Sequence, residues 1–259
     1  MKNMIFYITV IMLSGLMIVV MMNNQEKVSP KVITVSKSYA YHYDSNQSIE
    51  IPIYLNQADH PLSDLSSYSM VYIANEDATK KLELDLIKVL EGHHESYLNE
   101  TYLLYTLIFN MPYLDNLFEI ADCFIHIDLI NDDSYELMIG TFSLYHIQTS
   151  SKNLEWTSLS GMKQEHSFLS RLNKIIIEYA TITETIDYIE ISPHIETTFE
   201  LKDNQLIIYI ENDNYLLDNV PVIIHYANNE QQVIENFRYI IDYHILKESG
   251  MLINLYALN

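Results

Sequence analysis

TLIFNMPYLDNLFEIADCFIHIDLINDDSYELMIGTFSLYHI, residues 106–147, carries the pattern that decides the fold. Short apolar segments are separated by Tyr-Leu-Asp-Asn and by an Asn-Asp-Asp turn, and the stretch closes on Tyr-His-Ile. A second stretch, QLIIYIENDNYLLDNVPVIIHYANNEQQVIENFRYIIDYHI (205–245), repeats that order, with Tyr243 98 residues after Tyr145. A repeat of this length, built from several short strands, is typical of tandem β-sandwich domains.

Alternation of apolar and polar residues marks further strands. In SIEIPIYLN (48–56), Ile49, Ile51 and Ile53 fall on one face, and Pro52 indicates an edge position or a bulge. KLELDL (81–86) alternates in the same way, and FELKDNQLIIYIE (199–211) has the pattern of a hairpin. A period of two with one apolar face is typical of half-buried antiparallel strands.

Two segments are ambiguous between helix and strand. DATKKLELDLIKVLE (77–91) and SFLSRLNKIIIEYA (167–180) carry apolar residues at helical as well as at strand spacing. We interpret both as strands, the first with a bulge near Ile87, where the phase of the alternation changes.

The dipeptide Tyr-His occurs at 41–42, 145–146 and 243–244. The last two pairs close the repeated halves, and the first lies in the alternating KSYAYHY (37–43). We interpret each pair as a strand end, where the rings pack and their polar tips stay in water.

The chain is therefore predicted to be mainly β, with an N-terminal transmembrane helix followed by two tandem antiparallel β-sandwich domains of immunoglobulin-like type. The predicted ranges are 1–23 for a transmembrane anchor or signal peptide, 30–148 for the first sandwich and 153–259 for the second. The polar segment TSSKN (149–153) joins the sandwiches, and so short a linker implies that they lean on each other.

An apolar segment near the N-terminus has no charged residue over 19 positions, MIFYITVIMLSGLMIVVMM (4–22). A helix of that length spans about 28 Å, close to the hydrocarbon thickness of a bilayer. Lys2 precedes it, so the positive-inside bias places the N-terminus in the cytoplasm and the body outside. No small-x-small pair follows the apolar run, which favours an uncleaved anchor over a cleaved signal peptide. A buried core helix is less favoured, because such a helix would usually carry a polar face.

Charge narrows the classes of partner. The chain has 14 Lys+Arg against 35 Asp+Glu, a net charge of −21, which disfavours nucleic acid and anionic lipid headgroups. Solubility is the simplest reason for this charge, and a cationic partner is the alternative.

The 5 glycines are dispersed, which argues against phosphate-cradling loops. The Ile, Asn, Lys and Tyr usage resembles coding from an AT-rich bacterial genome.

Candidate reactive and metal-binding residues all have simpler interpretations. Cys123, the only cysteine, alternates in phase with Ile125 and is interpreted as a packing residue. His93 and His94 in EGHHES are predicted to lie at a solvated hairpin tip. A metal triad of His126, Asp128 and His146 is an alternative. We do not favour it, because 10 histidines in an acidic chain yield such a geometry by chance.

The acidic loops, Ser160 and Trp156 also have simpler interpretations than a functional site. Turn chemistry explains the acidic loops better than calcium does, because no spaced Asp-x-Asp-x-Asp loop is present. The residues concerned are Asn131, Asp132, Asp133, Asp213 and Asp218. Ser160 lacks a Gly-x-Ser-x-Gly elbow. Trp156 is the only tryptophan, whereas carbohydrate-binding sandwiches usually display several planar aromatics.

No catalytic, cofactor-binding or metal-binding residue is predicted, and no cofactor. The favoured function is a non-enzymatic, membrane-anchored extracytoplasmic interaction or binding module of a bacterial envelope, such as an accessory subunit of a membrane complex. Its predicted partners are the membrane, through the N-terminal helix, and an envelope protein, but not nucleic acid. The alternative is an envelope hydrolase or ligand-binding protein with a site at the junction of the two halves.

Overall fold

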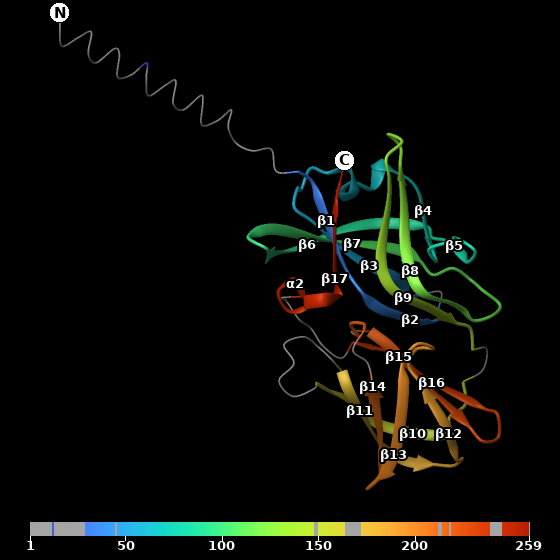
Figure 1. Ribbon diagram of the computed structural model, residues 1–259. Coiled ribbons are helices and arrows are strands. Elements are labelled where there is room, and N and C mark those ends of the chain that lie inside the picture. Colours follow the sequence, from blue (N-terminus) through green and yellow to red (C-terminus); the bar gives the residue numbers. More distant parts are fainter. Residues whose placement is uncertain are drawn as a thin grey trace, which may run out of the picture.

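A computed structural model describes residues 12, 29–44, 46–147, 150–163, 172–211, 214–217, 219–238 and 245–258. The chain is mainly β and builds several sheets (Figure 1). The strands are β1 (Lys31–Val35), β2 (Lys37–His42), β3 (Ser48–Leu55), β4 (Tyr68–Ala74), β5 (Lys81–Glu83), β6 (Leu86–Tyr97), β7 (Glu100–Asn110), β8 (Phe118–Leu129), β9 (Ser134–Tyr145), β10 (Leu154–Lys163), β11 (Leu172–Ile182), β12 (Ile186–Glu190), β13 (Glu196–Lys202), β14 (Gln205–Glu211), β15 (Asn219–Tyr226), β16 (Gln231–Arg238) and β17 (Ile253–Ala257). The short helices are η1 (Pro61–Ser63), η2 (Leu65–Ser67), α2 (Ile245–Glu248) and η3 (Gly250–Leu252).

Two sheets make up what we call the first body, formed by residues 29–147 and 245–258. Sheet I has the order β17-β1-β3-β7-β6, and sheet II has the order β2-β9-β8-β4-β5. Their facing sides share one apolar core, in which Ile49, Ile51 and Ile53 of β3 are fully buried, as the alternation predicts. Each buried aliphatic side chain of this kind contributes about 1.5–3 kcal/mol.

Two further sheets make up the second body, residues 150–238. Sheet III has the order β10-β11-β14-β13, and sheet IV has the order β12-β15-β16. Their shared core includes Ile175 and Ile177 of β11 and Ile208 of β14. The predicted hairpin is confirmed as β13 and β14, which turn at Asp203 and Asn204 with φ values of 51° and 60°.

The strand orders of the two bodies correspond. β3-β7-β6 in sheet I matches β11-β14-β13 in sheet III, and β9-β8-β4 in sheet II matches β16-β15-β12 in sheet IV. The repeat seen in the sequence therefore recurs as strand topology: β7, β8 and β9 take the same places as β14, β15 and β16. The third Tyr-His pair, Tyr243-His244, lies outside the described residues.

β1 and β2 are one stretch of chain that changes sheets at Ser36. β1 pairs with β3 in sheet I, and β2 pairs in parallel with β9 in sheet II. The predicted all-antiparallel pairing is therefore wrong for this one pair of strands. β1 pairs with β3 at Tyr54 and Leu55. Pro52 lies beyond the end of that pairing, so the N–H that Pro52 lacks is not needed for a hydrogen bond to β1.

The two bodies meet along β2. Leu216, from the connection between β14 and β15, forms a parallel bridge with Lys37 on the side of β2 away from β9. The amide of Ser38 donates to the Leu216 carbonyl at 3.0 Å, and the amide of Leu216 donates to the Ser36 carbonyl at 2.9 Å. Contact between the halves, which the short linker predicts, is therefore present along this strand (Figure 1).

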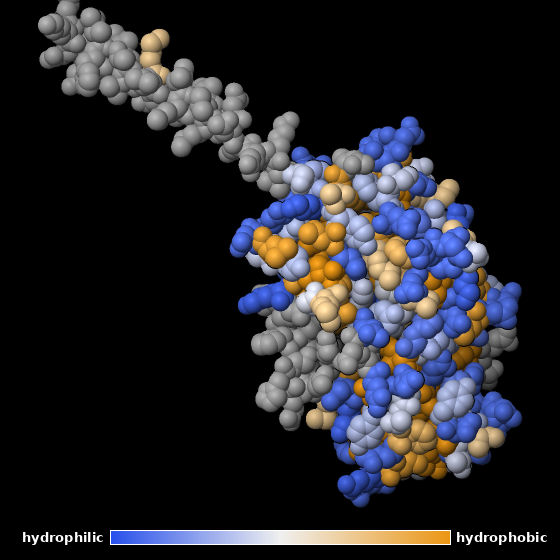
Figure 2. All heavy atoms as spheres, viewed as in Figure 1, coloured by the Kyte–Doolittle hydropathy of each residue, from blue (hydrophilic) through white to orange (hydrophobic). Residues whose placement is uncertain are grey.

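The C-terminal strand returns to the first body. β17 pairs antiparallel with β1, and the amide of Leu258 donates to the Pro30 carbonyl at 2.8 Å. α2 lies against the outer face of sheet I, where Leu246 is buried with Tyr54 and Tyr102. Apolar side chains gather above α2 on the visible face (Figure 2). The predicted domain ranges stay a prediction, and they did not anticipate this return of residues 253–257.

The two ambiguous segments are strands where the structure describes them. β5 and β6 are separate strands, and the pairing of β6 with β7 shifts between Leu86 and Lys88, so the predicted bulge at Ile87 is confirmed. Residues 172–182 form β11, while 164–171 lie outside the described residues. The predicted anchor also lies outside the described residues, apart from Met12. Among the described residues, no helix is long and apolar enough to span a membrane.

Gly140→Ala is expected to lower the free energy of unfolding by about 3 kcal/mol or more. Gly140 pairs with Lys37 at the start of β2 and has φ +115°, and a Cβ there would lie 2.1 Å from the Lys37 carbonyl oxygen. Urea unfolding of the two proteins measures the loss.

Gly250→Ala is the matched control, because Gly250 also has a positive φ (54°) but no atom lies within 4 Å of its added Cβ. It should cost only about 1 kcal/mol. Equal losses of unfolding free energy in the two variants would show that the close approach of Lys37 in β2 to Gly140 is not what makes this glycine necessary.

Candidate functional site

An open cavity of about 480 Å³ lies on the second body, where the linker runs into β10. Its lining residues are Ser150, Ser151, Lys152, Leu154, Glu155, Trp156, Thr181, Gln232 and Val233. They come from the linker, from the start of β10, from the end of β11 and from β16. Its volume is within the usual range for small-molecule sites.

The backbone of β10 is irregular at Trp156. The pairing with β11 shifts on both sides of this residue, between Glu155 and Trp156 and again before Ser158. Such bulges re-aim a side chain out of the regular alternation. The Trp156 side chain consequently remains 45% exposed beside the cavity, although β10 belongs to a sheet with a buried face.

Gln232 forms a rigid inner wall of the cavity. Its Oε1 accepts hydrogen bonds from the Leu154 amide and from the Tyr226 hydroxyl, both at 2.8 Å, and its Nε2 donates to the Leu154 carbonyl at 2.8 Å. The side chain is only 5% exposed. Because both ends of its amide are hydrogen-bonded, Gln232 fixes the start of β10 against β16.

The hydroxyl groups of the linker differ in how they are engaged. Ser150 Oγ accepts a hydrogen bond from the Val233 amide at 3.0 Å. Thr181 Oγ1 donates to Glu155 Oε2 at 3.1 Å. The Ser151 hydroxyl is buried and has no hydrogen-bond partner among the residues that the structure describes. A buried hydroxyl without a partner costs about 1–3 kcal/mol.

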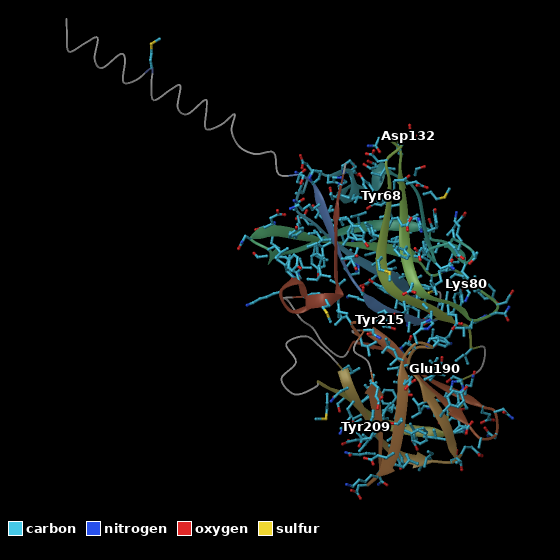
Figure 3. All side chains as sticks on the ribbon, in the orientation of Figure 1. Tyr68, Lys80, Asp132, Glu190, Tyr209 and Tyr215 are labelled. Atoms are coloured by element: carbon cyan, nitrogen blue, oxygen red, sulfur yellow. The ribbon has the colours of Figure 1, made fainter. Side chains whose placement is uncertain are left out.

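A second cluster of polar groups lies at the junction of the two bodies. The Tyr145 hydroxyl, at the end of β9, donates to Glu190 Oε1 at 2.7 Å, and His225 Nε2 lies 3.3 Å from Glu190 Oε2. The ring of Tyr188 stacks on His225 with 3.9 Å between centroids, and Gln231 Nε2 lies 3.1 Å from His225 Nδ1. Glu190 is labelled in Figure 3, at the end of the second body that faces the first.

These contacts set the ionisation of the cluster. Burial opposes ionisation of Glu190, but the contacts with His225 and Tyr145 outweigh burial and lower the pKa of the carboxyl. Burial, and then the charge of Glu190, raises the pKa of Tyr145, so its hydroxyl stays protonated and can donate. One oxygen of Glu190 thereby joins the two bodies through Tyr145, and the other lies beside His225 within the second body.

The structure does not bring the predicted alternative metal triad together. His126 stacks on Tyr72 with 4.5 Å between centroids, and Asp128 accepts a hydrogen bond from Ser134 at 2.6 Å. His146 instead packs against Tyr43 and Tyr113, with centroids 5.5 and 4.9 Å away. Within the described part of the chain, no group of three or more His, Cys, Asp or Glu residues is placed to hold a metal ion.

The predicted hairpin tip at His93 and His94 is wrong. Both residues lie inside β6, where the pairing with β7 shifts between Glu91 and His94, and the tip is at Leu98 and Asn99 with φ values of 48° and 64°. Local polarity suggested a turn, but the β6–β7 hairpin is longer than the polar segment. The neighbouring Glu95 is 5% exposed and accepts a hydrogen bond from the Leu246 amide at 2.7 Å.

The remaining candidates have structural places. Asn131–Asp133 form the turn between β8 and β9, where Asn131 Nδ2 donates to Asp133 at 2.7 Å. Asp213 and Asp218 lie outside the described residues. Ser160 sits within β10, opposite Ile176. Cys123 is fully buried in the core of the first body, and burial raises the pKa of its thiol.

Sequence reasoning missed the cavity at Trp156. The sequence contains one usable signal: the only tryptophan stands three residues after the polar linker, where a strand begins. The bulge that exposes it depends on the pairing of β10 with β11, which the alternation of β10 alone does not specify.

No family model matches this chain, and no curated protein matches it. Solved structures resemble it only at low sequence identity. The SGBP-B protein of the Bacteroides ovatus mixed-linkage glucan utilization locus, in complex with a mixed-linkage heptasaccharide, is 10% identical with a TM-score of 0.22. The match covers 78% of this chain and 42% of that one, so this chain spans less than half of its length.

Two adhesin structures give similar values. The D00-D0 domain of intimin is 7% identical with a TM-score of 0.22, over 82% of this chain and 100% of that one. The sialic acid binding region of the Streptococcus sanguinis SK1 adhesin is 9% identical with a TM-score of 0.21, over 83% and 78%. At these TM-scores no residue role or ligand is carried over to this chain.

Glu190→Gln is expected to remove stability that depends on pH. Because the folded-state pKa of Glu190 is lowered, its ionised form stabilises the protein above its ordinary pKa, and that contribution disappears as the pH falls through the lowered value. The variant should be about 1–3 kcal/mol less stable than the wild type at pH 7, and the difference should shrink below about pH 4. Urea unfolding at a series of pH values measures both quantities.

Glu184→Gln is the control, because Glu184 is an exposed carboxylate of the same body. It should leave the dependence of stability on pH close to that of the wild type. A wild-type minus Glu190→Gln difference that stays constant from pH 7 to pH 3 would show that the ionised carboxylate does not stabilise the junction.

Proposed function

We propose that this chain is a membrane-anchored, extracytoplasmic binding module of a bacterial envelope, with two tandem immunoglobulin-like sandwiches outside the cell. The strand orders support the fold assignment. Sheets III and IV have the orders β10-β11-β14-β13 and β12-β15-β16, which correspond to the A-B-E-D and C-F-G sheets of an immunoglobulin constant-type domain. The first body has the same order, with β1 and β2 as a first strand divided between its sheets.

The observation that carries the binding role is the cavity at Trp156. It combines an exposed aromatic ring, a buried hydroxyl without a partner in the described part of the chain and a hydrogen-bonded amide wall, which are the elements of a small recognition site. It lies on the second body, whereas Pro30, which follows the apolar segment in the sequence, is bonded to Leu258 in the first. An anchor before Pro30 would leave the second body at the far end of the molecule, presented to a ligand (Figure 1).

The second candidate function is an envelope hydrolase or ligand-binding protein with a site at the junction. The convergence of Glu190 and His225 is the observation in its favour. Their side chains are 23% and 12% exposed, however, and Tyr145 and Gln231 already engage them. Glu190 is thus used to join the bodies through Tyr145, while His225 contacts it within the second body, and we favour a binding role without catalysis, with an envelope protein as a further partner.

Charges placed in the apolar segment test the anchor and its orientation. The double variant Leu13→Arg/Leu16→Arg should be lost from membranes, because each Arg at the centre of a spanning helix costs about 3 kcal/mol of insertion. The wild-type chain should stay in the membrane fraction after an alkaline wash, and protease added to intact spheroplasts should digest its body. Ile130→Arg, at a position that is 68% exposed in the first body, is the control and should behave like the wild type.

Two results would contradict the proposal. One is a wild-type body that protease cannot reach in intact spheroplasts, which would place it in the cytoplasm. The other is a body found in the medium or periplasm without its first residues, which would make the apolar segment a cleaved signal peptide.

A further inference from the structure

We propose that the cavity at Trp156 binds a neutral saccharide, with one sugar ring stacked on the indole. This inference rests on the proposed binding role and names the ligand class for it. Three features of the cavity support this ligand class: its aromatic face, its hydrogen-bonding groups and its balance of charge.

The aromatic face is a single exposed indole. Trp156 is 45% exposed, and the pairing irregularities on both sides hold it out of the regular pleat of β10. A pyranose ring presents a flat array of C–H groups on one face, and an indole offers a complementary flat apolar surface. The cavity beside it, about 480 Å³, is large enough for a small saccharide.

The hydrogen-bonding groups around the ring are mostly uncharged. Ser150, Ser151 and Thr181 contribute hydroxyls, and those of Ser150 and Thr181, which already donate to the chain, keep oxygen lone pairs that can accept from sugar hydroxyls. Ser151 lines the cavity, and its Oγ is buried without a partner among the described residues, so a rotation of its side chain into the cavity would let it bond to a ligand hydroxyl without losing a bond to the chain. Thr181 already holds Glu155, which positions one acceptor at the mouth of the cavity.

The charges favour a neutral ligand over an ionic one. The cavity contains one cation, Lys152, and one anion, Glu155, so its local charge balances. An anionic ligand would approach a chain with a net charge of −21, which repels it. A quaternary ammonium ligand is recognised by a cage of several aromatic rings, and among the described residues Trp156 is the only aromatic one that lines this cavity.

The chain supplies its own reporter for the test. Trp156 is the only tryptophan, so tryptophan emission reports this cavity alone. The full chain in lipid nanodiscs, free of sugar-headed detergents, is titrated with neutral disaccharides: cellobiose, maltose, lactose, mannobiose and N,N′-diacetylchitobiose. Glucuronate and choline are the anionic and cationic comparators. At least one disaccharide should change the emission saturably, with a Kd of about 1 mM or tighter, and the two comparators should not.

Variants followed by calorimetry separate recognition from folding. Trp156→Ala should weaken binding about tenfold or more, and Trp156→Phe should retain most of the affinity because it keeps a flat ring. Ser151→Ala should weaken binding by about threefold to tenfold without lowering the thermal unfolding midpoint, since it removes a hydroxyl that has no partner among the residues that the structure describes. Tyr113→Ala is the control: Tyr113 is 58% exposed on the first body, away from the cavity.

Three outcomes would overturn the inference: no response to any disaccharide, a response to glucuronate or choline alone, or binding that survives Trp156→Ala. None of them would decide the proposed envelope location, which the membrane and protease experiment tests by itself. A response to choline or glucuronate would leave a binding module with a different ligand, so the two failures can be told apart.

Discussion

The structure depends on the hydrogen bonding of β2, which serves both bodies at once. One edge of this strand pairs in parallel with β9, and the other edge takes the bridge from Leu216 of the second body. Its side chains divide in the same way: Tyr39 and Tyr41 enter the core of the first body, while Ala40 packs into that of the second. A strand buried on both faces and occupied on both edges leaves little freedom for one body to move alone.

Polar contacts fix how the bodies meet along this strand. Ser38 bridges them: its hydroxyl lies 3.1 Å from Thr141 Oγ1 and 3.1 Å from Ser192 Oγ. All three side chains are nearly inaccessible to water, so a shift of one body would leave buried hydroxyls without partners. The hydrogen bond from Tyr145 to Glu190 adds a further polar contact between the bodies. A junction held in this way keeps the Trp156 cavity at a fixed place relative to the first body.

Alternation of apolar residues predicts much of this fold because each strand buries one face. It identified β3, the β13–β14 hairpin and the bulge at Ile87, and the repeat identified the matching order of β7, β8 and β9 with β14, β15 and β16. It did not identify the parallel pairing of β2 with β9 or the return of β17, because alternation carries no information about partner or direction. The Trp156 cavity escaped prediction for the same reason, since a bulge defined by the neighbouring strand exposes the ring.

The most direct test of a shared β2 uses two natural probes, one in each body. Trp156 is the only tryptophan and lies in the second body, and Cys123 is the only cysteine and is buried in the first. In one urea titration of the full chain, Trp156 emission and the labelling of Cys123 by a thiol reagent follow the two bodies separately. We expect coincident midpoints, because β2 belongs to sheet II of the first body and also packs into the core of the second. Two well-separated midpoints would show that the bodies unfold independently and would contradict this expectation.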